Sequence, residues 1–293
     1  MLNVSRLDFS RLRALRRFMR SEREVEEVQK HSARVLCIAS GKGGTGKSIV
    51  ASNLAALRAA RGERVCLVDF DAGLANAHLL LGVSPRYDLG HVMAGEVKAE
   101  DALVEGPNGL RLLSGGVGRP SLQNPTRREL ERLFRALEPL ESQFDLVIID
   151  HGAGVGYSTV AHLAATSTLL IVTNPEVTAL SDAYALFKRA HLVNKHVNIG
   201  AVINRAPDES SARSGFERFR NASQKFLGKE PVFAGWVPYD EAILRSVQSR
   251  TPACILEPDS PAAKAIGAVA DWEPIDMART SSAFYERARR ALR

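Results

Sequence analysis

The stretch Ser40–Ser48, SGKGGTGKS, follows the apolar run Val35–Ala39 and places four glycines and two lysines within nine positions. It matches the pattern G-x-x-x-x-G-K-[S/T], which is typical of a loop that holds phosphate groups. Glycines let successive backbone N–H groups point inward, and a helix that follows presents its positive N-terminal end. In such a loop Lys47 contacts the outer phosphates and the Ser48 hydroxyl binds Mg²⁺. A glycine-rich loop can also match by chance, so the flanking sequence has to decide.

The segments on both sides of the loop support the phosphate-binding interpretation. The run before it is apolar and partly β-branched, which favours a buried strand. After it, Ser48–Arg61 carries Val50, Leu54 and Leu57 at helical spacing and stops at Gly62. The sequence therefore predicts a strand, a loop and a helix in the order that a phosphate site needs.

Short apolar runs alternate with helical patterns from Arg34 to about Trp272. Strands separated by helices indicate an α/β fold, with a doubly wound, mostly parallel sheet flanked by helices. Ligands of such sheets bind beyond the carboxyl ends of the strands, where the Ser40–Ser48 loop is expected. The predicted strands are Val35–Ala39, Val65–Val68, Leu110–Leu113, Leu146–Ile149, Leu169–Thr173, Ile199–Ile203 and Val232–Trp236.

The chain has 293 residues, of which 45% are hydrophobic and 25% charged, as in ordinary globular proteins. We expect a basic helical extension over 1–33, one phosphate-loop domain over 34–275 and a basic amphipathic helix over 276–293. No apolar stretch approaches the roughly 20 residues that span a bilayer, and the N-terminus lacks a signal-peptide core. The composition therefore predicts a cytoplasmic protein.

The three cysteines are isolated in the sequence. Cys37 and Cys66 fall in predicted strands and Cys254 in a predicted loop, with no C-x-x-C pair. We expect buried, reduced thiols, and the spacing argues against an iron–sulfur or other thiolate metal site.

Carboxylates at strand ends are the next requirement for nucleotide chemistry, because triphosphate cleavage needs metal ligands and a positioned water. FDLVIIDHGAG is an apolar strand that ends in Asp150 and continues with small residues. Asp150 is predicted to hold Mg²⁺ through water, although an aspartate can also simply cap the turn. In VCLVDFDAGLAN, Asp69 and Asp71 are two residues apart, so both project to one side of an extended segment.

Together these stretches resemble a known family. GKGGTGKS with a lysine directly after its first glycine, DFDAGLAN and the strand-end Asp150 are similar to the deviant Walker A P-loop ATPases of the MinD/ParA group. DFDAGLANAHLLLGV, GPNGLRLLSGG, IIDHGAG, TNPEVTALSDAYALFK and VINRA resemble its FlhG (FleN/YlxH) branch of flagellar-number regulators. The resemblance covers about residues 34–272 and implies slow, partner-stimulated hydrolysis of ATP to ADP, with Mg²⁺ as the metal.

The resemblance also implies roles for individual residues. Lys42 resembles the signature lysine that reaches the partner's phosphates across an ATP-sandwiched dimer, which would offset the repulsion between two triphosphates. Asp71 resembles the residue that aligns the attacking water, and Asn76 a switch-segment residue beside it. The implied phosphate cradle is Gly41, Gly43, Gly44, Thr45, Gly46, Lys47 and Ser48; the implied metal shell is Ser48, Asp69 and Asp150; and the implied adenine pocket is Asn204 with Pro238 of WVPYD.

Two features depart from the family pattern. His151 follows the metal-associated aspartate where relatives more often carry a small or hydroxyl residue, and we interpret it as structural rather than catalytic. The N-terminal stretch LDFSRLRALR keeps an L-R element but lacks the D-Q-A of the flagellar branch. Whether that segment binds the branch's usual partner is left open by the sequence.

Both ends of the chain are rich in arginine, and the net charge is +6. Arg6–Arg20 and Ser281–Arg293 are candidate basic amphipathic helices, and relatives attach to membranes through a C-terminal one. Ser281–Arg293 is therefore expected to bind an anionic membrane weakly as one copy and more strongly in a dimer. The alternatives are solvated helices without a partner and a nonspecific nucleic-acid surface.

The function implied by the resemblance is a molecular switch, monomeric with ADP, dimeric with ATP and Mg²⁺, and reset by hydrolysis. Its role would be control of flagellar number or placement from the cytoplasm, reversibly at the inner face of the cell membrane. The SRP-type GTPase FlhF and flagellar basal-body proteins are the implied partners. Alternatives are division-site placement, chromosome or cargo partition, a cluster-carrying enzyme, and a non-hydrolysing nucleotide-binding scaffold.

Overall fold

The computed structural model describes residues 33–71, 75–116, 122, 124–153, 156–275 and 283–293. The predicted extension over 1–33, including Arg6–Arg20, lies outside the described residues apart from Ala33, as does the beginning of the predicted C-terminal helix.

An eight-stranded sheet forms the centre of the described chain, in the order β3-β4-β2-β5-β1-β6-β7-β8. All neighbouring strands are parallel except β3, which pairs antiparallel with β4. The predicted α/β fold class is confirmed, and each predicted strand has its counterpart; β3, with two residues, is too short to show a pattern. The strands are β1 (Arg34–Ala39), β2 (Val65–Phe70), β3 (Val104–Glu105), β4 (Arg111–Leu113), β5 (Leu146–His151), β6 (Thr168–Thr173), β7 (Asn198–Ala206) and β8 (Val232–Pro238).

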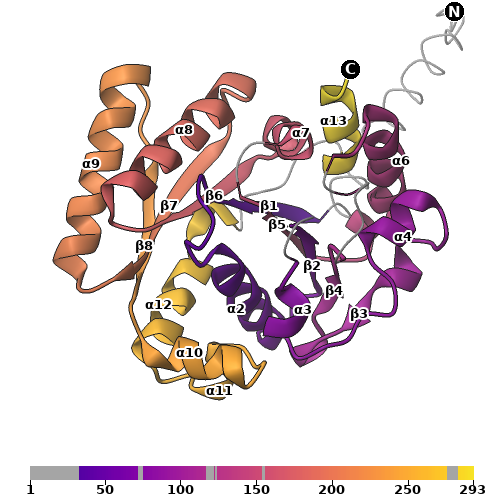
Figure 1. Ribbon diagram of the computed structural model, residues 1–293, viewed down its shortest axis with the longest axis horizontal. Helices are drawn as coiled ribbons and strands as arrows, with labels where there is room; N and C mark the ends of the chain where they lie inside the picture. Colours follow the sequence, from indigo (N-terminus) through magenta and orange to yellow (C-terminus); the bar gives the residue numbers. More distant parts are fainter. Residues whose placement is uncertain (1–32, 72–74, 117–121, 123, 154–155, 276–282) are drawn as a thin grey trace, which may run out of the picture.

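Helices cover both faces of the sheet because alternate strand residues are buried on opposite sides (Figure 1). Leu36 and Ile38 of β1 belong to the buried cluster on one side of the sheet, which includes residues of α2, α3 and α12. Val35 and Cys37 belong to the cluster on the other side, with residues of α4, α6, α7, α8, α9 and α13. The helices are α2 (Lys47–Ala60), α3 (Ala77–Leu80), α4 (Leu89–Ala94), α6 (Arg127–Leu137), α7 (Tyr157–Ala165), α8 (Val177–Val193), α9 (Glu209–Leu227), α10 (Glu241–Gln248), α11 (Ala253–Leu256), α12 (Pro261–Ala270) and α13 (Phe284–Ala291).

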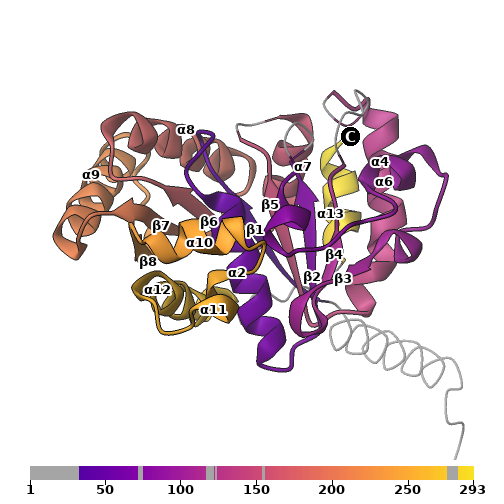
Figure 2. The same ribbon diagram turned by 60° about the horizontal axis from the view of Figure 1, so that its bottom comes forward.

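The C-terminal helix α13 packs into the core, beside α6 and α7 in both views (Figures 1 and 2). Phe284, Tyr285 and Leu292 are each at most 3% exposed. Glu141, in the 3₁₀ turn η3 (Glu138–Ser142), accepts the backbone N–H groups of Phe284 and Tyr285 at 2.7 and 2.8 Å. In this conformation the three apolar groups fill the space between α13 and its two neighbouring helices. The binding of Ser281–Arg293 to an anionic membrane stays a prediction.

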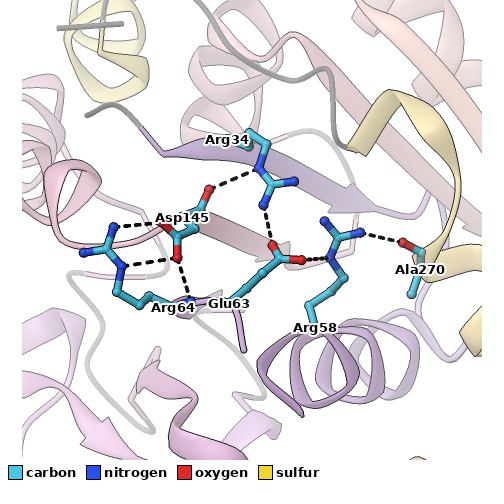
Figure 3. A network of polar contacts seen from close by, with 6 residues as sticks. All are labelled: Arg34, Arg58, Glu63, Arg64, Asp145 and Ala270. Atoms are coloured by element: carbon cyan, nitrogen blue, oxygen red, sulfur yellow. Dashed lines mark hydrogen bonds and ion pairs between the residues drawn. The ribbon is translucent and has the colours of Figure 1, made fainter. Parts of the chain in front are cut away.

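A network of charges joins elements at the opposite end of the sheet from the phosphate loop (Figure 3). Glu63, between α2 and β2, forms ion pairs with Arg34 at the start of β1 and with Arg58 of α2. Arg58 also donates to the carbonyl of Ala270 at the end of α12, and Arg34 to that of Asp145 before β5. These contacts link the start of β1 to α2, to the end of α12 and to the segment before β5.

The cysteines are free thiols. Cys37 and Cys66 are buried as predicted, and burial raises the pKa of each thiol to about 12. Cys254 lies in the short helix α11 rather than in a loop, and its Sγ is 3.5 Å from the carbonyl of Asn53. Among the described residues, no helix combines the length and the apolarity that crossing a membrane would need.

Candidate functional site: a nucleotide site at the strand ends

A cavity of about 800 Å³ opens at the carboxyl ends of β1 and β2. Its walls are the loop after β1, the end of β2, and segments of α3, α4, α6 and α7. The predicted site residues that line it are Gly43, Gly44, Thr45, Gly46, Lys47, Ser48, Asp69, Asp71 and Asn76. The cavity is not lined by the predicted residues Gly41, Lys42, Asp150, Asn204 and Pro238. Asp150 and Asn204 contact residues that do line it, Lys47 and Thr45.

The phosphate loop adopts a left-handed backbone conformation at two of its glycines. Gly44 and Gly46 have φ of +78° and +86°, which other residues adopt only with strain. A Cβ on Gly41 would lie 2.1 Å from the carbonyl oxygen of Asp182 in α8, so the loop packs directly on that helix. Helix α2 begins at Lys47 without a side-chain cap. Its first N–H groups are therefore available to an anion in the cavity.

The two lysines of the loop lie in different environments. Lys47 is 6% exposed, and its Nζ lies 2.9 Å from Asp150 Oδ1 and 3.2 Å from Ser48 Oγ. Lys42 is exposed to solvent and does not line the cavity of its own chain. Lys47 therefore lies in the cavity, and Lys42 lies outside it on the same loop.

The carboxylates fit a divalent cation. Asp69 and Asp150 are aligned partners in the neighbouring strands β2 and β5, and both are buried. Burial and the nearby Asp150 raise the pKa of Asp69 to about 7, and burial raises the pKa of Asp150 while Lys47 opposes it. Among the described residues Asp150 Oδ2 has no hydrogen-bond partner. Mg²⁺ bound near Ser48 would supply positive charge to the phosphates, and a water that it holds would offer Asp150 Oδ2 a hydrogen-bond donor.

Asp69 also organises the segment that contains Asp71 and Asn76. Its two carboxylate oxygens accept the N–H groups of Asp71 at 2.9 Å and of Ala77 at 3.1 Å. The side chain of Asp71 is close to Gly152, where a Cβ would lie 3.5 Å from Asp71 Oδ1. Asp71 is half-buried and Asn76 exposed at the cavity. Their roles in orienting water stay predictions, and their placement beside the phosphate loop is compatible with them.

Asn204 is tied to the phosphate loop rather than open to the cavity. Its Nδ2 donates to the Thr45 carbonyl at 2.7 Å, and its Oδ1 accepts the N–H of Arg205 at 3.0 Å. Pro238, at the end of β8, is paired with Ala206 at the end of β7. The adenine-reading role of Asn204 and Pro238 stays a prediction. Sequence reasoning did not single out the neighbouring Asn174, although its position directly after β6 in TNPE places it at the same edge.

His151 lies in a buried aromatic cluster. Its ring centroid is 5.0 Å from that of His162 in α7 and 6.4 Å from that of Phe70. Burial, aided by Lys47, lowers the pKa of His151 to about 3, and burial lowers the pKa of His162 well below its ordinary value. Among the described residues, His151 Nε2 and both ring nitrogens of His162 have no hydrogen-bond partner. Both histidines are therefore neutral side chains that pack in the core. The sequence around His162 gave no sign that this residue is buried.

Comparison with known proteins identifies the family of this site. Residues 36–253 match the family model of the CobQ/CobB/MinD/ParA nucleotide binding domain. The chain belongs to this family. The antiactivator FleN of Pseudomonas aeruginosa is 32% identical over 240 residues, which are 82% of this chain and 86% of FleN. The flagellum site-determining protein YlxH of Helicobacter pylori is 32% identical over 222 residues, 75% of each chain.

A solved structure of a related protein shows the same fold with a nucleotide. The septum site-determining protein MinD of Pyrococcus horikoshii, complexed with Mg-ADP, superposes with a TM-score of 0.67 at 28% identity. The match covers 81% of this chain and 94% of that one. The resemblance to MinD/ParA ATPases is thus confirmed, and so, at the level of the family, are ATP or ADP and Mg²⁺ as cofactors.

Proposed function

We propose that this chain is an ATP-dependent dimerising switch of the FlhG type, which regulates the number or placement of flagella. Its similarity to FleN and YlxH over most of the chain supports the flagellar role. In this proposal ATP and Mg²⁺ favour a homodimer, hydrolysis returns the chain to the ADP-bound monomer, and turnover is slow and stimulated by a partner. FlhF and basal-body proteins are the proposed partners.

The observation that carries the proposal is the contrast between Lys42 and Lys47. Lys47 is buried against Asp150 in the internal site, whereas Lys42 is exposed on the same loop. Two nucleotide-loaded faces repel one another through their triphosphates, since like charges at close range in a partly desolvated interface cost several kcal/mol. A lysine that each chain extends to its partner would reverse that repulsion only when the triphosphate is present. The exposure of Lys42 supports the proposal that this lysine makes dimerisation depend on ATP.

The dimer proposal is tested by light scattering coupled to size exclusion, in an Asp71→Ala background intended to slow hydrolysis. The Asp71→Ala chain is expected to run as a dimer with Mg-ATP and as a monomer with Mg-ADP. Adding Lys42→Ala should keep nucleotide binding but leave a monomer with ATP. Adding Lys47→Ala should abolish nucleotide binding, because the internal phosphate contact is lost. A dimer that persists with ATP in the Lys42→Ala chain would contradict the proposed role of this lysine.

Association with an anionic membrane through Ser281–Arg293 belongs to the same proposal and implies a cytoplasmic chain at the inner face of the membrane. Because Phe284, Tyr285 and Leu292 are buried in the described conformation, attachment requires α13 to leave its site between α6 and α7. The exposed Arg290 and Arg293 would then contact lipid headgroups while the apolar groups enter the interface.

A further inference from the structure

Helices α8 and α9 present large apolar side chains to solvent. Leu192 of α8 is 61% exposed and Phe226 of α9 is 65% exposed. The ring of Tyr184 contacts that of Phe226 edge-on, with centroids 6.1 Å apart. Tyr184, Lys188 and Leu192 follow one another one helical turn apart, so they lie on one stripe of α8. Tyr184, Lys188, Leu192, Lys225 and Phe226 form a surface that we call the α8–α9 patch.

The patch carries positive charge beside its apolar groups. Lys225 Nζ lies 5.3 Å from the centroid of the Phe226 ring, and Lys188 lies between Tyr184 and Leu192 on α8. Both lysines are exposed, and within the described parts of the chain neither forms an ion pair. Exposed apolar side chains and unpaired lysines on one surface are typical of a site that lies against an anionic membrane.

The patch belongs to a basic side of the molecule. Helices α6, α8, α9 and α13 cover the same face of the sheet, and each carries more arginine and lysine than aspartate and glutamate. On the opposite face, α10 is balanced, the charged residues of α2 are buried, and Lys264 of α12 is paired with Asp259. Figure 1 shows α8 and α13 on the upper side of the view, and α10 and α11 on the lower side. An anionic surface is therefore attracted to the side that holds both the patch and α13.

We propose that the α8–α9 patch is a second contact with an anionic membrane. Phe226 and Leu192 enter the boundary between headgroups and acyl chains, and the two lysines bind anionic headgroups. A nucleic acid fits the patch less well, because Leu192 can neither bind a phosphate nor stack on a base as an aromatic ring does. The inference rests on the proposed membrane attachment and deepens it, since it names the side of the molecule that faces the lipid.

The patch adds to the attachment that α13 provides and does not replace it. Two lysines and two inserted apolar groups hold the chain weakly by themselves. Once α13 is in the membrane, the patch meets the same lipid surface at a high effective concentration, so that the two contacts reinforce one another. Loss of the patch is therefore expected to weaken membrane binding, whereas loss of α13 is expected to abolish it.

The first test places a tryptophan in the patch and measures whether it touches lipid. The Asp71→Ala chain, loaded with Mg-ATP, is mixed with anionic vesicles that contain brominated phosphatidylcholine, whose bromines quench tryptophan on contact. Phe226→Trp in this background is expected to lose more fluorescence than the parent chain with Trp236 and Trp272. Leu244→Trp is the matched control, because Leu244 is 52% exposed on α10, on the opposite face. It should be quenched no more than the parent chain.

The second test changes the charge of the patch. Lys188→Glu combined with Lys225→Glu is expected to weaken binding of the Asp71→Ala chain to the same vesicles about tenfold or more, measured by flotation. Arg245→Glu combined with Lys264→Glu is the control, because it changes the net charge equally on the opposite face. This pair should leave vesicle binding close to that of the parent chain.

A chain that floats while its Phe226→Trp variant is quenched no more than the parent would overturn the inference and leave attachment through α13 intact. Equal losses of binding in the two charge variants would also overturn it, because net charge alone would then explain the effect. Binding to a DNA duplex that depends on Lys188 and Lys225, without quenching at Phe226→Trp, would make nucleic acid the occupant of the patch. A parent chain that floats with neither nucleotide would refute the membrane part of the proposed function, and this inference with it.

Discussion

Gly46 shows how one residue serves both the backbone and the site. Its φ of +86° is left-handed, and a Cβ there would overlap Asn204 Nδ2. Gly46→Ala is expected to displace the loop from Asn204 and to weaken Mg-ATP binding by about tenfold or more, measured by titration calorimetry. Gly62→Ala is the control, since φ there is +90° but no atom lies within 4 Å of the added Cβ. Equal losses of affinity in the two variants would show that the contact with Asn204 is unimportant.

The buried histidines predict how stability depends on pH. His162 is neutral in the folded chain because burial lowers its pKa, whereas in the unfolded chain it binds a proton below about pH 6.5. Wild type therefore loses stability as pH falls below about 6.5, since the unfolded state then binds more protons than the folded state. His151 and Tyr285, the titratable groups that face the ring, contact it at centroid distances of 5.0 and 6.0 Å.

His162→Phe should remove this contribution, because phenylalanine suits the aromatic surroundings and cannot be protonated. When the pH is lowered from 7.5 to 5.0, the variant is expected to lose about 2 kcal/mol less unfolding free energy than wild type. Urea unfolding at both pH values measures it, with the same replacement at the exposed His196 as control. If wild type and His162→Phe change equally between the two pH values, the buried ring does not carry the effect.

At the scale of elements, the network around Glu63 joins α2, β1, β2 and α12. The side chains of Arg34 and Arg58 are 11% and 5% exposed, so the removal of their shared carboxylate leaves poorly hydrated charges. Glu63→Ala is expected to lower the free energy of unfolding by about 2–3 kcal/mol, less than for a fully buried pair because Glu63 itself is 22% exposed. Urea denaturation provides the measurement.

Asp271→Ala is the matched control for Glu63→Ala, since its ion pair with Arg61 is exposed on both sides. It is expected to cost less than about 1 kcal/mol. A Glu63→Ala chain as stable as Asp271→Ala would mean that the network contributes nothing beyond an ordinary surface pair, and that the strand starts are held by the sheet alone.

Helix α13 is the element for which sequence and structure differ most. The pattern of Phe284, Ala288 and Leu292 correctly predicts an amphipathic helix. The pattern does not say what covers the apolar face, because a membrane and a protein groove both accept the same spacing. In the described conformation a protein groove covers this face, because α13 contacts α6 and α7 and Glu141 accepts two of its N–H groups.

At the scale of the whole molecule, docking of α13 competes with the proposed membrane attachment. Glu141→Gln should weaken docking, because a neutral amide with one acceptor oxygen replaces a carboxylate that accepts two N–H groups. In flotation with anionic vesicles, the Asp71→Ala chain is expected to bind with ATP and not with ADP. Adding Glu141→Gln should raise binding in the ADP state severalfold.

The control for flotation is Glu131→Gln, which makes the same change on α6 at an exposed pair with Arg127. Deletion of residues 283–293 should abolish binding in both nucleotide states. No flotation of the Asp71→Ala chain with either nucleotide would remove the membrane from the proposed function and leave a protein or nucleic-acid partner to be sought.

Local patterns were sufficient for the phosphate loop, the order of strands and helices, and the acidic residues at strand ends. Each depends on residues a few positions apart, whose spacing reports backbone conformation and burial directly. The contacts that complete the site join distant residues: Lys47 with Asp150 across 103 positions, and Asn204 with Thr45 across 159. The docking of α13 on Glu141, 143 positions away, is of the same kind. Such pairings depend on how the sheet and its helices pack, and no spacing along the chain encodes them.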